Sequence, residues 1–193
     1  MLLAAIYASA FPFSVHEPSL QLSTAFDGLP IDALWSLAYE LIMENIHRPK
    51  LAVVQTALLF MQQPPGGRTQ ALNDNPVTWS FWASILGLSN SLGLHLECRR
   101  WGIPTWEKRL RRRLWWAIYI EDTWRSFLSG RPPFIHIDEW DVSDLDDTDF
   151  VHNIAPASTL RRPPVSTASV GRCCIFPHVV RLTLLVAEIY QNF

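Results

Sequence analysis

The chain has 193 residues, of which 49 % are hydrophobic, 12 % aromatic and 18 % charged, and it contains nine Trp. This composition is too apolar for a disordered chain, and the length favours one domain with a substantial core. The formal net charge of −2 argues against a general affinity for nucleic acid or for anionic membranes.

The N-terminal segment is apolar but lacks the basic residue with which a signal peptide normally begins. We therefore expect a buried N-terminal helix, cut from a longer architecture, rather than a signal peptide. No apolar run approaches the ~20 residues needed to span a bilayer. Three cysteines, Cys98, Cys173 and Cys174, are too few for a disulfide framework and indicate a reducing compartment.

Helical periodicity dominates the next part of the chain. Apolar residues at three- and four-residue spacing predict an amphipathic helix over Ile31–His47, and Leu51–Met61 is apolar nearly all round, as in a central buried helix. Gln62–Asn75 contains two Pro and two Gly in succession and predicts a loop. Asn75 is then the expected N-cap, and Pro76 the first residue, of a helix reaching to about Glu97. The buried stripe of that helix is expected at Trp82, Ile85, Leu86, Ser89, Leu92 and Leu96.

A long helix is predicted over Trp106–Ser129, with Thr105 as its N-cap and Gly130 ending it. Its inward stripe is expected at Trp106, Leu110, Leu114 and Ala117, continued by Trp124 and Leu128. Glu121 also falls on this stripe, where an unpaired carboxylate would cost several kcal/mol. Arg125, one turn further on, is the local candidate partner, although a distant arginine or a backbone amide would also serve.

The last part of the chain has less regular patterning. Ile135–Phe150 is acidic without a helical period, Ala155–Arg172 is rich in Ser, Thr, Pro and Arg, and Ile175–Phe193 is again helical in pattern. We therefore predict an all-α fold, an irregular multi-helix bundle with a long acidic loop and a flexible insertion. The expected organisation is one helical domain over 1–154, an insertion over 155–172, and a C-terminal helix of the same domain over 173–193.

The charges are unevenly placed. Arg99–Arg113 carries a local charge of +6, and Asp138–Asp149 a local charge of −7. Three interpretations of the basic strip remain open: a helix start whose arginines pair with carboxylates, including the acidic segment; a nuclear import signal; or a phosphate-binding strip. The strip consists of Lys108, Arg109, Arg111, Arg112 and Arg113.

Residues for metal or catalytic chemistry are sparse. His95 and Cys98, together with Cys173, Cys174 and His178, could supply zinc ligands, but strong zinc signals use two close-spaced pairs. Neither a phosphate-binding loop nor a nucleophile elbow occurs in the sequence. We therefore expect no metal and no cofactor in this chain, and no enzymatic activity.

Three stretches form a recognisable pattern in a fixed order. Trp79–His95 ends in Leu-Gly-Leu-His, Trp106–Asp122 joins a Glu and an arginine run to Leu-Trp-Trp and an acid, and Ser129–Ile135 holds a Gly-Arg-Pro turn, followed by Asp141-Val142. Together, Val53–Phe150 resembles the fungal-specific transcription factor domain, the middle homology region of regulators that carry a zinc binuclear cluster. Leu2–Phe13 and Phe176–Phe193 extend the resemblance loosely.

The resemblance implies an all-helical regulatory domain of a nuclear transcription factor, with no catalytic residues. Family members bind DNA through an N-terminal module of six cysteines around two zincs, and this chain lacks that pattern. Zinc and DNA are therefore expected only through a missing module, and the partners are other transcription regulators or a small-molecule effector. Cys98–Trp106 and the Gly-Arg-Pro turn are similar to the subgroup that regulates nitrogen and amine catabolism.

The residues that match the family motif are interpreted as chiefly structural, since aromatic residues at helical spacing usually form core. Two alternatives to the regulatory function are an effector-sensing helical domain without a DNA role and an unrecognised helical enzyme. The motif residues are Glu107, Arg111, Arg112, Arg113, Trp115, Trp116, Asp122, Gly130, Arg131 and Pro132.

Overall fold

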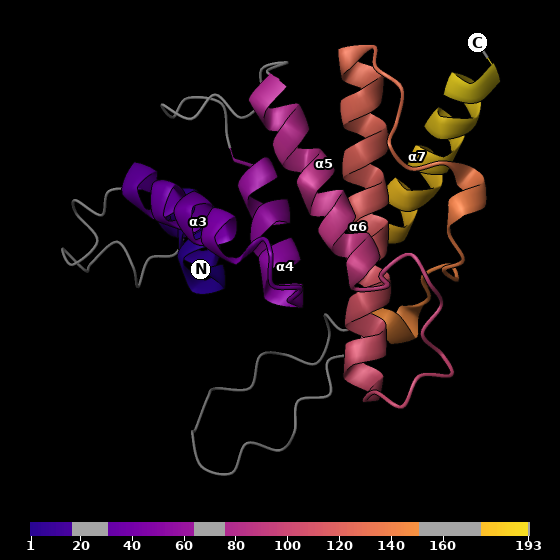
Figure 1. The fold of residues 1–193 in the computed structure, drawn as a ribbon, viewed down its shortest axis with the longest axis horizontal. Coiled ribbons are helices and arrows are strands. Elements are labelled where there is room, and N and C mark those ends of the chain that lie inside the picture. Colours follow the sequence, from indigo (N-terminus) through magenta and orange to yellow (C-terminus); the bar gives the residue numbers. More distant parts are fainter. Residues whose placement is uncertain (17–30, 64–75, 151–174, 193) are drawn as a thin grey trace. The chain divides into compact units, whose positions relative to one another are not determined.

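The computed structural model describes residues 1–16, 31–63, 76–150 and 175–192. The chain divides into two compact units, Met1–Gly93 and Leu94–Phe193, which we call the N-terminal unit and the C-terminal unit. Helices form the regular structure of both units (Figure 1), and the β pairing within the described residues is one isolated parallel bridge between Leu96 and Asp141. The prediction of an all-α fold is confirmed.

The N-terminal unit is built around a buried central helix. Helix α1 (Leu2–Ala10) is followed by a short 3-10 helix, η1 (Phe11–His16), and then by α3 (Ile31–Asn45), α4 (Leu51–Met61) and α5 (Pro76–Ser91). Helix α4 packs against α1, α3 and α5, which explains why its sequence is apolar nearly all round. Its buried residues are Val53, Val54, Thr56, Ala57, Phe60 and Met61.

Aromatic rings from three helices meet in the core of this unit. Phe60 of α4 lies against Trp35 and Tyr39 of α3 and against Phe81 of α5, with ring centroids 5.5–6.0 Å apart. Edge-to-face and tilted contacts of this kind add to the stabilisation that burial of the rings provides. The predicted stripe of α3 therefore faces the core, with Trp35, Ala38 and Ile42 buried.

The prediction that the helix beginning at Pro76 reaches Glu97 is wrong at its C-terminal end. Helix α5 stops at Ser91, and Gly93 takes the left-handed backbone conformation with φ 68°. A glycine in this conformation ends a helix readily because it has no Cβ to clash. Leu96, expected on the buried stripe, is consequently outside the helix and 46 % exposed.

The C-terminal unit is organised by α6 (Thr105–Ser129), which packs against α7 (Ile175–Asn192) and the 3-10 helix η4 (Asp147–Phe150). A further short 3-10 helix, η3 (Ile137–Glu139), lies in the acidic segment. Gly130 ends α6 in the left-handed conformation, φ 63°, as predicted. The N-cap prediction is wrong by one residue, because Pro104 holds the N-cap position and Thr105 is already helical.

The predicted inward stripe of α6 agrees with the structure in the middle of the helix, and the prediction is wrong at both ends. Leu114 is buried, but Trp106 is 58 % and Leu128 78 % exposed. Beyond Tyr119 the buried face carries Asp122 and Ser126, because the chain that follows the helix returns to this side. A single apolar stripe extended along the helix could not anticipate that change.

Glu121 is buried, as the stripe predicted, and it is paired. Its carboxylate accepts hydrogen bonds from Nε and Nη2 of Arg125, which confirms the local partner one turn further along the helix.

Part of the predicted organisation lies outside the described residues, namely the flexible insertion at 155–172, Cys173 and Cys174. The division into a domain over 1–154 and a C-terminal helix stays a prediction. Within the described parts of the chain, the helices are all too short or too polar to cross a membrane.

Candidate functional site

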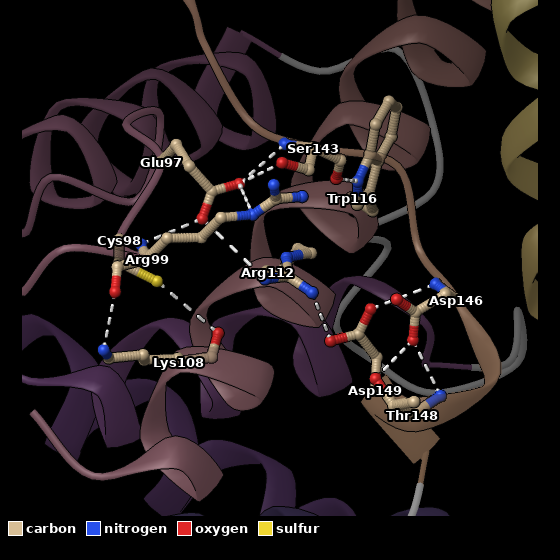
Figure 2. A network of polar contacts seen from close by, with 10 residues as sticks. All are labelled: Glu97, Cys98, Arg99, Lys108, Arg112, Trp116, Ser143, Asp146, Thr148 and Asp149. Carbon is tan, nitrogen blue, oxygen red and sulfur yellow. Dashed lines mark hydrogen bonds and ion pairs between the residues drawn. The ribbon is translucent and has the colours of Figure 1, made fainter.

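The basic strip of α6 meets the acidic segment through Arg112. Its Nη1 lies 2.6 Å from Oδ1 of Asp149, and its Nη2 lies 3.8 Å from Oε1 of Glu97 (Figure 2). The side chain of Asp149 is fully buried and that of Arg112 is 12 % exposed. Burial opposes the charge of Arg112, but the hydrogen bond and charge of Asp149 and the charge of Glu97 outweigh it and raise the pKa of the guanidinium.

Glu97 connects this arginine to the acidic segment from the other side. Its Oε2 accepts hydrogen bonds from both the backbone N–H, at 3.0 Å, and the hydroxyl of Ser143. Burial raises the pKa of Glu97, but the bonds from Ser143 and the positive charges of Arg112 and Arg99 together hold it below its ordinary value. Glu97 is therefore ionised while it holds the loop in place.

Asp149 also fixes the end of the acidic segment locally. Its Oδ2 accepts a hydrogen bond from the backbone N–H of Asp146 at 3.1 Å. Asp146 in turn accepts hydrogen bonds from the backbone N–H, at 2.7 Å, and the hydroxyl of Thr148. The hydroxyl of Thr148 and the backbone N–H groups of Thr148 and Asp149 lower the pKa of the exposed Asp146 carboxylate. The acidic segment is thus a structured turn bound to α6.

The other basic residues of the strip also have defined surroundings. Arg111 binds Glu107 one turn before it, with Nε 3.0 Å from Oε1, and its guanidinium lies 5.2 Å from the ring centre of Trp101. Lys108 donates from Nζ to the carbonyl oxygen of Arg99 at 2.7 Å. Arg109 and Arg113 are half-buried.

The paired tryptophans anchor α6 in an aromatic cluster. Trp115 and Trp116 are almost fully buried, and both pack against Trp140, with ring centroids 6.0 and 5.3 Å away. The indole of Trp116 donates to the carbonyl oxygen of Ser143 at 3.0 Å. His95 lies at the edge of the cluster, 6.4 Å from Trp115.

Three ring nitrogens of this cluster are buried and lack a hydrogen-bond partner among the described residues: Nδ1 of His95 and Nε1 of Trp115 and Trp140. Such atoms are uncommon in folded proteins, and each calls for an explanation in terms of a ligand, a solvent molecule or strain.

The Gly-Arg-Pro turn is held to both helices of this unit. Asp122 accepts a hydrogen bond from the backbone N–H of Ile135 at 3.0 Å. The N–H of Arg131 donates to Ser126 at the end of α6, and its carbonyl accepts the hydroxyl of Tyr190 from α7, each at 3.0 Å. Pro132 is exposed. The turn therefore directs the chain from α6 back along the same unit.

Of the candidate zinc ligands, His95, Cys98 and His178 lie in the described residues, among which no group of three or more His, Cys, Asp or Glu side chains could hold a metal ion together. Cys98 is buried, and its thiol lies 3.7 Å from the carbonyl oxygen of Lys108. Burial and the charge of Glu97 raise the pKa of this thiol.

Sequence reasoning missed three residues that hold this site together: Glu97, Ser143 and Trp140. Pairing of the strip's arginines with carboxylates of the acidic segment was one of three interpretations that the sequence left open, and the Arg112–Asp149 pair agrees with it. The partner of each arginine could not be predicted, because Glu97 and Asp149 are 15 and 37 positions away from Arg112 along the chain.

The family model described as "Fungal specific transcription factor domain" matches residues 1–192. The chain belongs to this family, and the match extends well beyond the Val53–Phe150 segment that carries the motifs.

Its relatives are named as regulators of transcription. The chain is 34 % identical over 154 residues to the transcriptional activator protein DAL81 of Saccharomyces cerevisiae, covering 79 % of this chain and 15 % of that protein. It is 30 % identical over 194 residues to the uncharacterized transcriptional regulatory protein C25B8.11 of Schizosaccharomyces pombe, covering 100 % of this chain and 26 % of the relative.

A third relative is the cutinase transcription factor 1 alpha of Fusarium vanettenii, 28 % identical over 109 residues, covering 56 % of this chain and 12 % of that protein. The chain thus spans about a quarter or less of the length of these relatives. No solved structure shows significant similarity to it.

Proposed function

We propose that residues 1–193 are a regulatory module through which a nuclear transcription factor controls transcription by RNA polymerase II, and that they do not bind a specific DNA site themselves. The observation that carries this proposal is the family match over residues 1–192. The contacts of the basic strip support the second part, because Arg111 and Arg112 bind carboxylates of their own chain. Phosphate binding would have to compete with those ion pairs.

Further properties follow from this proposal. Zinc and specific DNA contacts belong to a separate module outside residues 1–193, and the chain itself catalyses no reaction. Its partners are other transcription regulators or a small effector. The proposal includes the subgroup that regulates nitrogen and amine catabolism, which is supported by the resemblance of Cys98–Trp106 and of the Gly-Arg-Pro turn.

A fusion experiment tests the regulatory role. The chain would be joined to an unrelated zinc-cluster DNA-binding module and assayed on a reporter gene in yeast. We expect reporter output to change relative to the DNA-binding module alone, and Trp116→Ala to abolish the change because it removes a fully buried anchor. Equal output with and without the chain would contradict the proposal.

Direct DNA binding is tested on the purified chain. Fluorescence anisotropy with duplexes of different sequence should give only weak binding without sequence preference. Tight, specific binding that falls when Arg111, Arg112 and Arg113 are changed to Ala would overturn this expectation. The double variant Lys108→Ala/Arg109→Ala removes basic charge from the strip but keeps the Arg111–Glu107 and Arg112–Asp149 ion pairs. It therefore distinguishes the loss of DNA contacts from a disturbed fold.

A second candidate function is effector sensing at the aromatic cluster. The buried nitrogens of His95, Trp115 and Trp140, which lack hydrogen-bond partners within the described parts of the chain, favour it, because two of them are indole donors suited to a carboxylate or carboxamide oxygen. Titration of the chain with amino acids and their amides, followed by tryptophan fluorescence, tests this function. Saturable quenching that Trp140→Phe removes would support sensing here, and unchanged fluorescence across the series would contradict it.

A further inference from the structure

Helix α7 has two apolar faces, and α6 covers one of them. On the covered face Val180 and Thr183 are buried, and the Thr183 hydroxyl accepts a 2.9 Å hydrogen bond from the indole of Trp124 on α6. On the other face four large apolar side chains are between 50 and 76 % exposed: Ile175, Leu182, Leu185 and Ile189. Figure 1 shows α7 in yellow beside α6.

The spacing of the exposed face is that of a coiled-coil seam. With the exposed His178, its residues stand at positions 175, 178, 182, 185 and 189, which alternate three and four residues apart. This spacing places them at successive a and d positions of a heptad. Two of these positions, Leu182 and Leu185, lie at the centre of the seam.

The charges beside the seam have a definite pattern. Arg181 and Glu188 are both exposed, and each comes directly before an a position, so they flank the seam on the same side. Val179 and Val186 occupy the corresponding positions on the opposite side. One flank therefore carries a cation and an anion seven residues apart, and the other flank is apolar.

We propose that α7 pairs with α7 of a second copy of this chain, antiparallel and about a two-fold axis between Leu182 and Leu185. In this register Leu182 packs against Leu185 of the other copy, and His178 packs against Ile189 of the other copy. The flank that carries Arg181 and Glu188 then lies against the same flank of the other helix. Arg181 of each copy faces Glu188 of the other copy, so the two-fold axis generates two equivalent ion pairs. This self-complementarity is what a two-fold interface requires.

A parallel pair would not match these charges. It would bring the flank of Arg181 against the flank of Val179 and Val186 and leave the cation and the anion without partners across the interface. The charge pattern therefore selects the antiparallel arrangement. Because α7 is about 27 Å long, the interface is small, and we expect a dissociation constant in roughly the micromolar range.

Sedimentation equilibrium of the 193-residue chain over about 1–200 μM tests the proposal. We expect a reversible monomer–dimer equilibrium, and Leu185→Asp should weaken association at least about 100-fold by placing charge at the centre of the seam. Val77→Asp, at a 62 % exposed residue of α5, is the matched control and should leave association unchanged. Circular dichroism checks that both variants fold.

Charge reversal tests the orientation. Arg181→Glu and Glu188→Arg should each weaken dimerisation about tenfold, and the double variant should restore it, since the pairs are then re-formed with opposite sense. A chain that stays monomeric, or a dimer indifferent to Leu185→Asp, would overturn the proposal. Single variants that weaken the dimer without rescue by the double variant would overturn the antiparallel register.

Discussion

Arg112 joins three parts of the C-terminal unit that are distant in sequence. It extends from α6 to Asp149 in η4 and to Glu97 in the connection before α6, and Glu97 holds Ser143. Its neighbour Arg111 contacts Glu107 on the same helix and the ring of Trp101. Adjacent arginines of one run therefore have different structural importance.

This difference predicts unequal costs of substitution. Arg112→Gln leaves the fully buried Asp149 carboxylate without its cation and should lower the free energy of unfolding by about 3 kcal/mol. Arg111→Gln removes an ion pair within one helix and should cost below about 1 kcal/mol. Urea denaturation of the two variants measures both values, and equal losses would show that the Arg112 pair is not a structural link.

The lowered pKa of Glu97 predicts that the free energy of unfolding depends on pH in the acid range. Because its pKa in the folded chain lies below the ordinary value of 4.5, its contribution is fully present above that value and is lost as the pH falls through the folded pKa. Glu97→Gln should therefore reduce the slope of unfolding free energy against pH below about 4.5. Asp144→Asn, at an exposed residue of the acidic segment, is the control and should keep the slope.

At the scale of elements, α6 changes its surroundings along its length. Its first turns carry the basic strip, its middle is anchored by Trp115 and Trp116, and its last turns contact the returning chain and α7. The order of arginines, tryptophans and a Gly-Arg-Pro turn therefore reflects the course of α6. The helix starts near the surface and ends where the chain reverses its direction.

Replacing glycine by alanine should have opposite effects on stability at two positions, Gly130 at the end of α6 and Gly87 inside α5. Gly130 has φ 63°, and a Cβ added there would meet no atom within 4 Å, so Gly130→Ala should destabilise by about 1 kcal/mol through backbone strain alone. Gly87 lies inside α5 with equally open space, so Gly87→Ala should stabilise by about 0.5–1 kcal/mol. Thermal unfolding distinguishes the two, and a stabilised Gly130→Ala variant would contradict the assignment.

At the scale of the molecule, the net charge of −2 conceals two opposite clusters that the fold of the C-terminal unit joins. In the basic cluster, Arg111 and Arg112 bind carboxylates, and Lys108 donates to a backbone carbonyl oxygen. The opposite charges of the two clusters thus hold the acidic segment to α6.

Metal removal tests the expectation that the chain itself holds no zinc. The purified chain should contain well below one zinc per molecule, and EDTA should leave its thermal midpoint unchanged, because a structural zinc site contributes directly to folding. Stoichiometric zinc together with a fall in the midpoint on chelation would contradict this expectation and would direct attention to Cys173, Cys174 and His178.

The sequence by itself determined the helical class, the buried middle of α6 and its stop at Gly130, and it offered Arg125 as the local candidate partner of Glu121. These features depend on residues within a few turns of one another, whose spacing alone fixes which side they share. Only the tertiary structure decided the partners of Arg112, the place of Trp140 and the exposure of Trp106 and Leu128. Those depend on which distant segment packs where, and periodicity along one helix carries no information about the chain that returns to cover it.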